Sequence, residues 1–196
     1  DRKTGTVVDE LHSDYLASSG KNVIVKTLKV SDPDLWDEFS PSLYELTCSA
    51  KSKFGKDAYE PVIFGFRSIG RTDDYITVNG LKRYLRGNLD CAVFPLTGYP
   101  ATDKESWLRI FQAYKDYGLN HVRFHSWTPP KAAFEAADEL GLYVLSEIFW
   151  RDGWMGKALD IEEVEPFLRP ELRRIADAYG NHPSLVMLAM GNELGG

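Results

Sequence analysis

The stretch NHPSLVMLAMGNE, residues 181–193, is the part of the sequence that indicates the fold most strongly. Its centre, Ser184–Met190, is almost wholly apolar, which is typical of a strand covered on both faces of a parallel sheet. A helical pattern precedes it and ends at Gly180, and the polar pair Asn192 and Glu193 follows it directly. A helix, a buried strand and polar residues at the strand's carboxyl end together predict one unit of an α/β domain.

Three further strands are predicted upstream, and each is followed by a helix. They are Leu85–Asn88, His121–Ser126 and Leu142–Ile148. Four parallel strands that alternate with helices make half of a (β/α)8 barrel, because the complete barrel needs eight strands and typically about 250 residues. We therefore predict that residues 73–196 form the N-terminal half of a TIM barrel.

Capping residues predict where the helices of this block begin and end. Thr102 and Glu105 form a capping box, and Gly118 closes the helix that follows. That helix buries one face, formed by Trp107, Ile110, Phe111 and Tyr114. The other expected boundaries are Thr128 as an N-cap before Pro129, Gly141 as a helix end, Asp160 as an N-cap, and Pro170 as the start of a second helix that ends at Gly180.

Residues 1–72 have the two-residue alternation of half-buried strands. The clearest stretches are Asn22–Val30, Leu43–Ser49 and Pro61–Ser68, with turn-forming residues between them. Antiparallel strands in this rhythm predict an immunoglobulin-like β-sandwich. Such a domain normally has about seven strands over roughly 100 residues, whereas four or five are counted here, so the sandwich is expected to be partial.

A hairpin is expected where the two blocks meet. The pair Asn79-Gly80 is suited to the positive φ angles of a type I′ turn. Residues 76–84 on either side of this pair form the two arms of the hairpin, and strands begin to alternate with helices after it. The change of rhythm places the boundary between the blocks at residues 72–73.

Composition narrows the classes of partner. The net charge is −6, with 43% hydrophobic and 27% charged residues, which argues against a nucleic-acid footprint and a polybasic membrane surface. No apolar run approaches the roughly 18 residues of a membrane span. The chain begins at Asp1 with no initiator Met and no leader, so any secretion signal is expected to have been removed or to lie outside these residues. A secreted or periplasmic location is favoured over a cytoplasmic one, although the compartment stays open. Cys48 and Cys91 have no motif spacing and are predicted to be unpaired thiols in the core.

Polar and aromatic residues gather where the predicted barrel strands end. These ends are 88–90, 125–127, 147–154 and 192–193. In barrel enzymes the loops at the carboxyl ends of the strands build the active site. The sequence therefore predicts a functional site at this edge.

The order of motifs along the chain closely resembles glycoside hydrolase family 2. Its signature reads Asn-His-Pro-Ser, an apolar strand, and Gly-Asn-Glu, as residues 181–193 do here. The other matching motifs are Trp36 with Pro41-Ser42-Leu43-Tyr44, then Phe64-Gly65-Phe66-Arg67, Asn79-Gly80, Leu85-Arg86-Gly87, Asn120-His121-Val122-Arg123 and residues 138–144. The resemblance spans about 160 residues.

The resemblance implies a retaining exo-β-glycosidase that removes terminal sugars from oligo- or polysaccharides with two carboxylates. Glu193 matches the acid/base residue, which protonates the departing oxygen and later deprotonates water. Asn192 matches the residue that binds the sugar 2-hydroxyl. The matching nucleophile would lie beyond residue 196, so the 196 residues alone are expected to be inactive.

Four residues of the strand-end loops are candidates for contact with sugar. His125 either binds a substrate hydroxyl or is an interior histidine with its own partner. Trp127, Trp150 and Trp154 either stack on sugar faces or pack in the protein, and we expect at least one of the three to contact sugar.

Glu147 and Arg86 complete the predicted substrate-binding set. Glu147 matches a family glutamate at a strand end, and the alternative is a structural ion pair with Arg86 or Arg123. Arg86 is expected to orient a carboxylate in the site through its bidentate fork. The Glu-x-His pair that binds magnesium in some galactosidases of the family is missing from residues 148–154, so neither a metal nor a cofactor is expected.

Two other classes of function remain as alternatives. The first is a non-catalytic carbohydrate-binding module, against which Asn192-Glu193 argues, because binding alone needs no proton donor. The second is a metal-dependent barrel enzyme that uses His125 and Glu147, which lacks a metal-binding pair. Beyond a carbohydrate substrate, the open edges of a half-barrel leave assembly into a homo-oligomer as a further expectation. The sugar and the linkage stay open.

Overall fold

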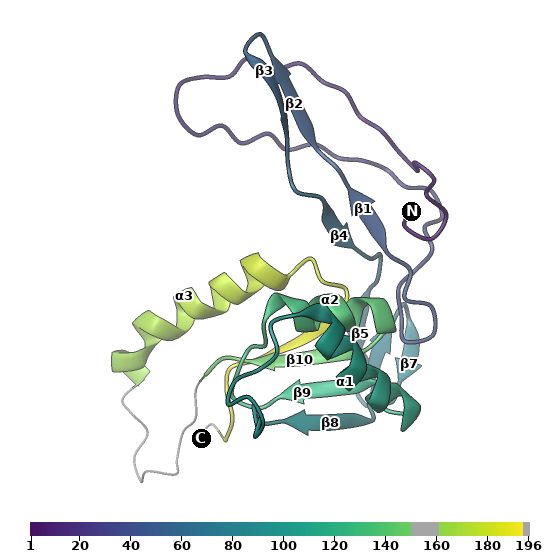
Figure 1. Cartoon of the computed structure of the whole chain (residues 1–196), viewed down its shortest axis with the longest axis vertical. Coiled ribbons are helices and arrows are strands. Elements are labelled where there is room, and N and C mark those ends of the chain that lie inside the picture. Colours follow the sequence, from purple (N-terminus) through teal and green to yellow (C-terminus); the bar gives the residue numbers. More distant parts are fainter. Residues whose placement is uncertain (150–160, 194–196) are drawn as a thin grey trace.

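The computed structural model describes residues 1–149 and 161–193, and the side chains of residues 161–165 are outside this description. A small N-terminal block of short antiparallel strands stands against a parallel sheet with helices (Figure 1). The N-terminal strands are β1 (Tyr44–Leu46), β2 (Ser49–Ser52), β3 (Gly55–Ala58), β4 (Val62–Phe64), β5 (Ile69–Arg71), β6 (Ile76–Val78) and β7 (Leu81–Arg83). The second block contains β8 (Gly87–Asp90), α1 (Lys104–Asp116), β9 (His121–Phe124), α2 (Lys131–Leu140), β10 (Tyr143–Glu147), α3 (Ile161–Tyr179) and β11 (Leu185–Ala189).

The second block is built on a four-stranded parallel sheet in the order β11-β10-β9-β8. Helices α1 and α2 pack on one face of the sheet (Figure 1). Their contact surface is formed by Trp107, Phe111 and Phe134, which meet Val122 and Val144 of the sheet, all of them fully buried. Sequential parallel strands with intervening helices fit part of a barrel, as the sequence predicts.

Both helix starts differ from the sequence prediction. The N-cap of α1 is Asp103 rather than Thr102, because the Asp103 carboxylate accepts a hydrogen bond from the Ser106 amide at 2.8 Å. Helix α2 begins at Lys131 and is not capped by the Thr128 side chain. A residue that precedes proline is disfavoured in the helical region, so Pro130 prevents the helix from starting at Pro129.

Two further boundaries also differ. Helix α3 continues through Pro166 and Pro170 instead of restarting at Pro170. Both prolines are exposed, so water can replace the backbone bonds that they remove. The first strand of the sheet begins at Gly87 rather than Leu85, because Arg86 and Asn120 pair just before it: the Arg86 amide donates to the Asn120 side-chain oxygen at 2.8 Å. The predicted cap Asp160 lies outside the described residues.

Strand β11 is half-buried rather than covered on both faces as the sequence suggests. It is an edge strand of the sheet in the described part of the chain. Its residues are mostly of intermediate burial, and Leu188 is 37% exposed. The apolar run therefore forms a strand of the predicted type, but among the described residues only one neighbouring strand, β10, pairs with it.

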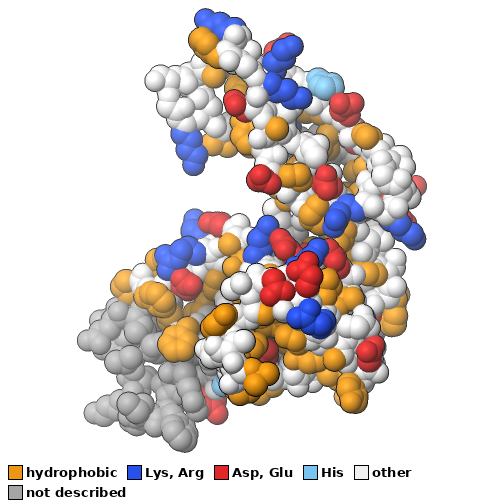
Figure 2. Space-filling view, in the orientation of Figure 1, with side chains coloured by type: hydrophobic (Ala, Val, Ile, Leu, Met, Phe, Trp, Pro, Cys, Tyr) orange, Lys and Arg blue, Asp and Glu red, His pale blue; other side chains and the backbone are white. Residues whose placement is uncertain are grey.

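The N-terminal block has fewer and shorter strands than predicted. Strand β1 pairs with β4, and β2 with β3, as separate antiparallel ribbons. The predicted strand Asn22–Val30 is absent from the described structure, since this segment pairs with no other strand and leaves Val23 and Val25 75% and 84% exposed. The antiparallel pairs fit part of a sandwich, and apolar side chains lie among charged ones over this block (Figure 2).

The two cysteines are free, as predicted, but they are not core residues. Cys48 and Cys91 are both exposed. Cys48 lies between two short strands, and Cys91 directly follows β8. Loop positions of this kind run over the surface and give a thiol no apolar cover.

Strands β5, β6 and β7 form a three-stranded antiparallel sheet at the amino ends of the parallel strands (Figure 1). The turn between β6 and β7 has φ angles of 53° at Asn79 and 74° at Gly80, which confirms the predicted hairpin. Val78 of this sheet is 1% exposed and packs in one cluster with Trp36 and Tyr143. The hairpin thus closes the end of the block that lies opposite the strand-end loops.

Side chains of both blocks interlock at this closed end. Trp36 is fully buried, donates from its indole nitrogen to the Asp138 carbonyl at 2.8 Å, and meets Tyr143 edge to face. The Arg67 guanidinium donates to the carbonyls of Pro183 and Leu185 at 2.8 and 2.6 Å. Acidic and basic side chains gather side by side on the outer surface of the second block (Figure 2). The ion pairs of α1 and α2 include Lys104 with Glu139 at 2.7 Å and Lys131 with Glu135 at 2.9 Å.

Gly141 and Gly118 end α2 and α1 in the left-handed region and differ in what surrounds them. An alanine Cβ at Gly141 would lie 2.8 Å from the Asp37 carbonyl oxygen, whereas one at Gly118 would meet nothing within 4 Å. We expect Gly118→Ala to lower the free energy of unfolding by roughly 1–2 kcal/mol through backbone strain alone, and Gly141→Ala to lower it clearly more. Urea unfolding of both variants checks this, and equal losses would show that the two blocks do not touch at Gly141.

Within the described residues, no helix is long and apolar enough to cross a membrane.

Candidate active site

The carboxyl ends of the parallel strands meet at one edge of the sheet. Because β8, β9, β10 and β11 all run in the same direction, the residues that follow them share this edge. The strand-end edge therefore brings together Asp90, His125, Glu147, Asn192 and Glu193.

Glu147, the last residue of β10, has a buried carboxylate that is fully engaged. It is 1% exposed. One carboxylate oxygen accepts from Arg123 Nε at 2.6 Å, and the other accepts from the Ser126 amide, also at 2.6 Å. Of the two arginine partners that the sequence left open, the structure selects Arg123. Contact between Glu147 and a sugar stays a prediction.

Asn192 joins this network from the fourth strand end. It is 8% exposed, and its side-chain oxygen accepts from Arg123 Nη2 at 2.8 Å. Arg123 thus bridges Glu147 and Asn192, so one hydrogen-bonded chain links β9, β10 and the segment after β11. Arg123 is not among the site residues that the sequence predicts. Its spacing two residues before His125 is the available signal, because alternate residues of a strand share a face.

Glu193 follows Asn192 directly and is exposed at the same edge. Its backbone is in the left-handed region, with φ of 50°. This conformation turns the chain immediately after the buried Asn192. Glu193 is therefore an exposed residue beside the hydrogen-bonded network of Glu147, Arg123 and Asn192.

Left-handed backbone recurs along the strand-end edge. Among the non-glycine residues of the described chain with positive φ, Ala92, Ser126 and Glu193 follow β8, β9 and β11. The Ser126 side-chain oxygen is also buried and has no hydrogen-bond partner within the described structure. Residues in sparsely populated backbone conformations are found more often at functional sites, where the surrounding structure holds them in place. A buried hydroxyl without a hydrogen-bond partner is likewise uncommon and can mark such a site.

The predicted contacts His125 and Trp127 lie on the loop after β9, and both are half-buried. The backbone amide of His125 and the indole nitrogen of Trp127 donate to the Asp90 carbonyl at 2.8 and 3.1 Å. The Trp127 ring stands edge to face against Phe124 at 5.1 Å and packs on the core beneath it. For Trp127 the structure shows a packing role. Its contact with sugar stays a prediction, as does that of His125.

Burial raises the pKa of the Asp90 carboxyl above its usual range, although a hydrogen bond from the Ala92 amide opposes this.

Arg86 is not at this edge, which differs from the prediction. It precedes β8, at the opposite end of the strand. Its guanidinium donates to the carbonyls of Gly118 and Tyr84 at 2.8 and 3.3 Å, and it meets the Glu38 carboxylate at 3.4 Å. The expected bidentate fork on a site carboxylate is therefore absent, because three different acceptors share the guanidinium. Trp150 and Trp154 lie outside the described residues.

The Asn-His-Pro-Ser part of the signature also lies at the amino end of its strand. His182 Nδ1 pairs with the Asp138 carboxylate at 2.6 Å, and the Ser184 amide donates to the other oxygen at 3.0 Å. The His182 ring stacks on Phe134, with ring centroids 5.4 Å apart. These contacts hold the start of β11 against α2, so this part of the signature stabilises the fold and does not form part of the strand-end edge.

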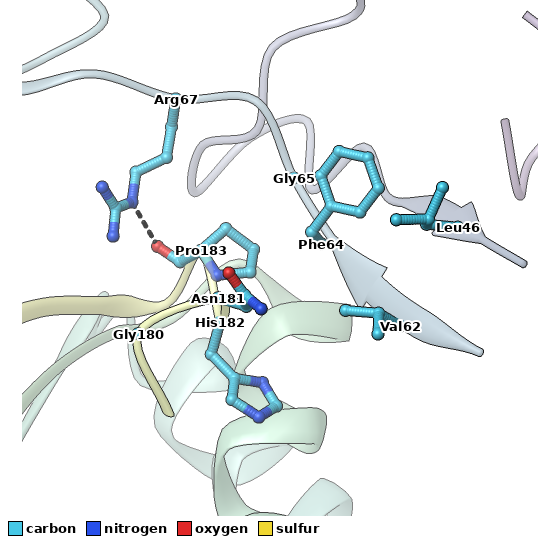
Figure 3. A pocket seen from close by; sticks show the side chains of 9 residues that line it. All are labelled: Leu46, Val62, Phe64, Gly65, Arg67, Gly180, Asn181, His182 and Pro183. Atoms are coloured by element: carbon cyan, nitrogen blue, oxygen red, sulfur yellow. Dashed lines mark hydrogen bonds between the residues drawn. The ribbon is translucent and has the colours of Figure 1, made fainter. Parts of the chain in front are cut away.

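A pocket of about 330 Å³ opens next to this motif, between the two blocks (Figure 3). It lies at the amino end of β11, whereas Glu193 follows the carboxyl end, so it is separate from the strand-end edge. The guanidinium of Arg67 is turned toward the Pro183 carbonyl (Figure 3). The lining residues are Leu46, Val62, Phe64, Gly65, Arg67, Gly180, Asn181, His182 and Pro183.

Within residues 1–149 and 161–193, the His, Cys, Asp and Glu side chains form no group of three that could hold a metal ion.

Comparison with known proteins agrees with this arrangement. The family model for glycosyl hydrolases family 2 matches residues 1–67. A putative beta-glucuronidase from Formosa agariphila is 32% identical over 192 residues, which are 93% of this chain and 17% of that protein. A beta-galactosidase from Thermoanaerobacterium thermosulfurigenes is 31% identical over 160 residues, 81% of this chain and 21% of that protein. The chain thus spans about a fifth of the length of the curated relatives that it matches.

Solved structures give the same result. A glycosyl hydrolase family 2 member from Bacteroides cellulosilyticus is 30% identical, with a TM-score of 0.70 over 85% of this chain and 22% of that one. The beta-glucuronidase 3 of Bacteroides uniformis is 28% identical, with a TM-score of 0.68 over 84% of this chain and 20% of that one. The motifs, the parallel sheet and these similarities agree, and the chain belongs to glycosyl hydrolase family 2.

Proposed function

We propose that the chain supplies the acid/base part of the active site of a retaining exo-β-glycosidase that removes terminal sugars from oligo- or polysaccharides. The observation that carries this proposal is the exposed Glu193 carboxylate, which stands directly after the buried Asn192 at the carboxyl end of β11. Family membership supplies the chemistry in which such a pair acts.

In this mechanism Glu193 protonates the glycosidic oxygen as the bond to the anomeric carbon breaks. A second carboxylate, about 5–5.5 Å away, attacks the anomeric carbon and forms a glycosyl-enzyme. Glu193 then takes a proton from the water that releases the sugar. Asn192 binds the 2-hydroxyl, a contact that strengthens in the transition state. The relatives are about four to six times as long as this chain, and we assign the second carboxylate to the rest of such a protein, so the 196 residues alone should not turn over substrate.

The architecture that goes with this mechanism is a partial immunoglobulin-like sandwich over residues 1–72 and the N-terminal half of a TIM-barrel catalytic domain over residues 73–196. The antiparallel pairs β1–β4 and β2–β3 support the first assignment. The sheet order β11-β10-β9-β8, with helices between successive strands, supports the second. In such a barrel the strand-end edge would form one side of the active-site mouth.

The names of the relatives indicate which sugars to test first. Their names include beta-glucuronidase and beta-galactosidase, so a β-glucuronide and a β-galactoside are the first substrates to test. These sugars differ in the group at carbon 6, and the strand-end loops would have to distinguish a carboxylate from a hydroxymethyl group there.

Retention of configuration is the expected outcome of the decisive experiment. A protein of the relatives' full length that contains this chain is given 4-nitrophenyl β-glucuronide, β-galactoside and β-mannoside, and the anomer first released is followed by proton NMR. We expect one of the three to be cleaved with the β-anomer appearing first. The α-anomer appearing first would contradict the retaining mechanism, and saturable binding without cleavage would instead indicate a carbohydrate-binding module.

A further inference from the structure

Arg123 is half-buried and holds a central position in the hydrogen-bonded network at the strand-end edge, although none of the three mechanistic steps above uses it. It lies on β9 and contacts two other strand ends: Nε donates to the Glu147 carboxylate at 2.6 Å, and Nη2 donates to Asn192 Oδ1 at 2.8 Å. The guanidinium therefore spans residues that are 24 and 69 positions away along the chain. An arginine can make this double contact because its donors are fixed in one plane.

The contact with Arg123 determines which end of the Asn192 amide faces which way. A guanidinium has only donors, so the atom that faces it has to be the amide oxygen rather than the NH2 group. With Oδ1 held by Arg123, the donor end of the amide is directed away from the guanidinium. Asn192 is 8% exposed, so protein groups such as Arg123 surround its side chain rather than water.

Glu147 in turn holds Arg123. Its carboxylate is 1% exposed, and its second oxygen accepts from the Ser126 amide at 2.6 Å. The carboxylate is thus fixed by backbone on one side and fixes the guanidinium on the other. A chain of hydrogen bonds therefore runs from the Ser126 amide to Glu147, from Glu147 to Arg123 and from Arg123 to Asn192. Glu193 is the next residue in the sequence.

We propose that Arg123 is a positioning residue, which locks the Asn192 amide with its NH2 group toward the 2-hydroxyl of the terminal sugar. This inference rests on the proposed function, because it assumes that Asn192 meets that hydroxyl. Without Arg123 the amide can flip and present its oxygen, and the contact that strengthens in the transition state is no longer prepared in advance. Arg123 acts through Asn192 and does not itself touch the sugar at this hydroxyl.

The test compares variants on substrates with and without the 2-hydroxyl. A protein of the relatives' length that contains this chain is assayed with the 2,4-dinitrophenyl β-glycoside of the sugar that it cleaves and with the 2-deoxy counterpart. We expect Arg123→Met to lower kcat/KM on the parent substrate by roughly tenfold to a hundredfold, and to change kcat/KM on the 2-deoxy substrate by less than about threefold. Arg109→Met, at an exposed arginine of α1, is the matched control and should leave both values unchanged.

Two more variants separate this inference from the proposed function and from a loss of structure. Asn192→Ala should show the same dependence on the 2-hydroxyl, and adding Arg123→Met to it should cause little further loss. If Asn192→Ala slows both substrates equally, the assigned role of Asn192 is wrong. If Asn192→Ala is selective and Arg123→Met is not, the positioning role is overturned.

Arg123→Lys keeps the test decisive if Arg123→Met does not fold. Lysine retains the positive charge beside Glu147, but as a single point donor it cannot reproduce the planar double contact. We expect a smaller loss than for Arg123→Met, again confined to the substrate with the 2-hydroxyl. An equal loss on both substrates in this variant would also overturn the proposal.

Discussion

Replacing Glu193 with alanine, in a protein of the relatives' length that contains this chain, is expected to lower kcat/KM for glycosides with poor leaving groups by about 10²–10⁴. The loss should be far smaller for 2,4-dinitrophenyl glycosides, because an acidic phenol departs without being protonated. The measurement is a series of aryl β-glycosides of increasing leaving-group pKa, with Glu60→Ala, at an exposed glutamate of the N-terminal block, as the control. The variant should show a steep dependence of rate on leaving-group pKa where the parent shows a shallow one.

Azide provides the second half of this result. In the alanine variant the glycosyl-enzyme lacks a base to activate water, and a small anion can attack the anomeric carbon without one. Added azide should therefore raise turnover of the dinitrophenyl substrate and give the β-glycosyl azide. An equal loss for all leaving groups, with no azide product, would show that Glu193 is not the acid/base residue.

Trp36→Ala is expected to cause the largest loss of stability, about 3–5 kcal/mol in the free energy of unfolding. Trp36 is fully buried between the two blocks. Its removal would leave a cavity beside Tyr143 and take away the indole donor of the Asp138 carbonyl. A loss of this size is a large fraction of the roughly 5–15 kcal/mol that stabilises a typical domain.

Phe39→Ala is the matched control for this prediction, because Phe39 is also aromatic, lies three positions away and is 76% exposed. Its replacement should change the unfolding free energy by less than about 0.5 kcal/mol. Urea unfolding followed by tryptophan fluorescence and by far-ultraviolet circular dichroism measures both variants. Similar midpoints for Trp36→Ala and the parent would mean that the blocks are not joined through this side chain.

Local pattern predicted many of the elements that build the site. Strands β9 and β10 lie within their predicted ranges, and α1 buries Trp107 and Phe111 on the predicted face. The Asn79-Gly80 turn forms as expected. Each of these depends on residues that are close in sequence, through helical periodicity, strand alternation or the backbone freedom that a turn needs. Helix starts were less well predicted, because neighbouring caps compete, as Thr102 and Asp103 do at α1.

What the sequence by itself determined is the family, the parallel arrangement and the position of Asn192 and Glu193 after a strand. Only the tertiary structure decided that Arg123 rather than Arg86 pairs with Glu147, and that Asn192 joins them. Both arginines lie within predicted strands, and no local pattern separates them. The register of the parallel sheet does, because it sets Arg123 opposite Leu145, two residues before Glu147, whereas Arg86 precedes its strand and turns to Gly118 and Glu38 at the opposite end. Contacts over such sequence distances depend on how whole strands align, which the composition of any one strand does not specify.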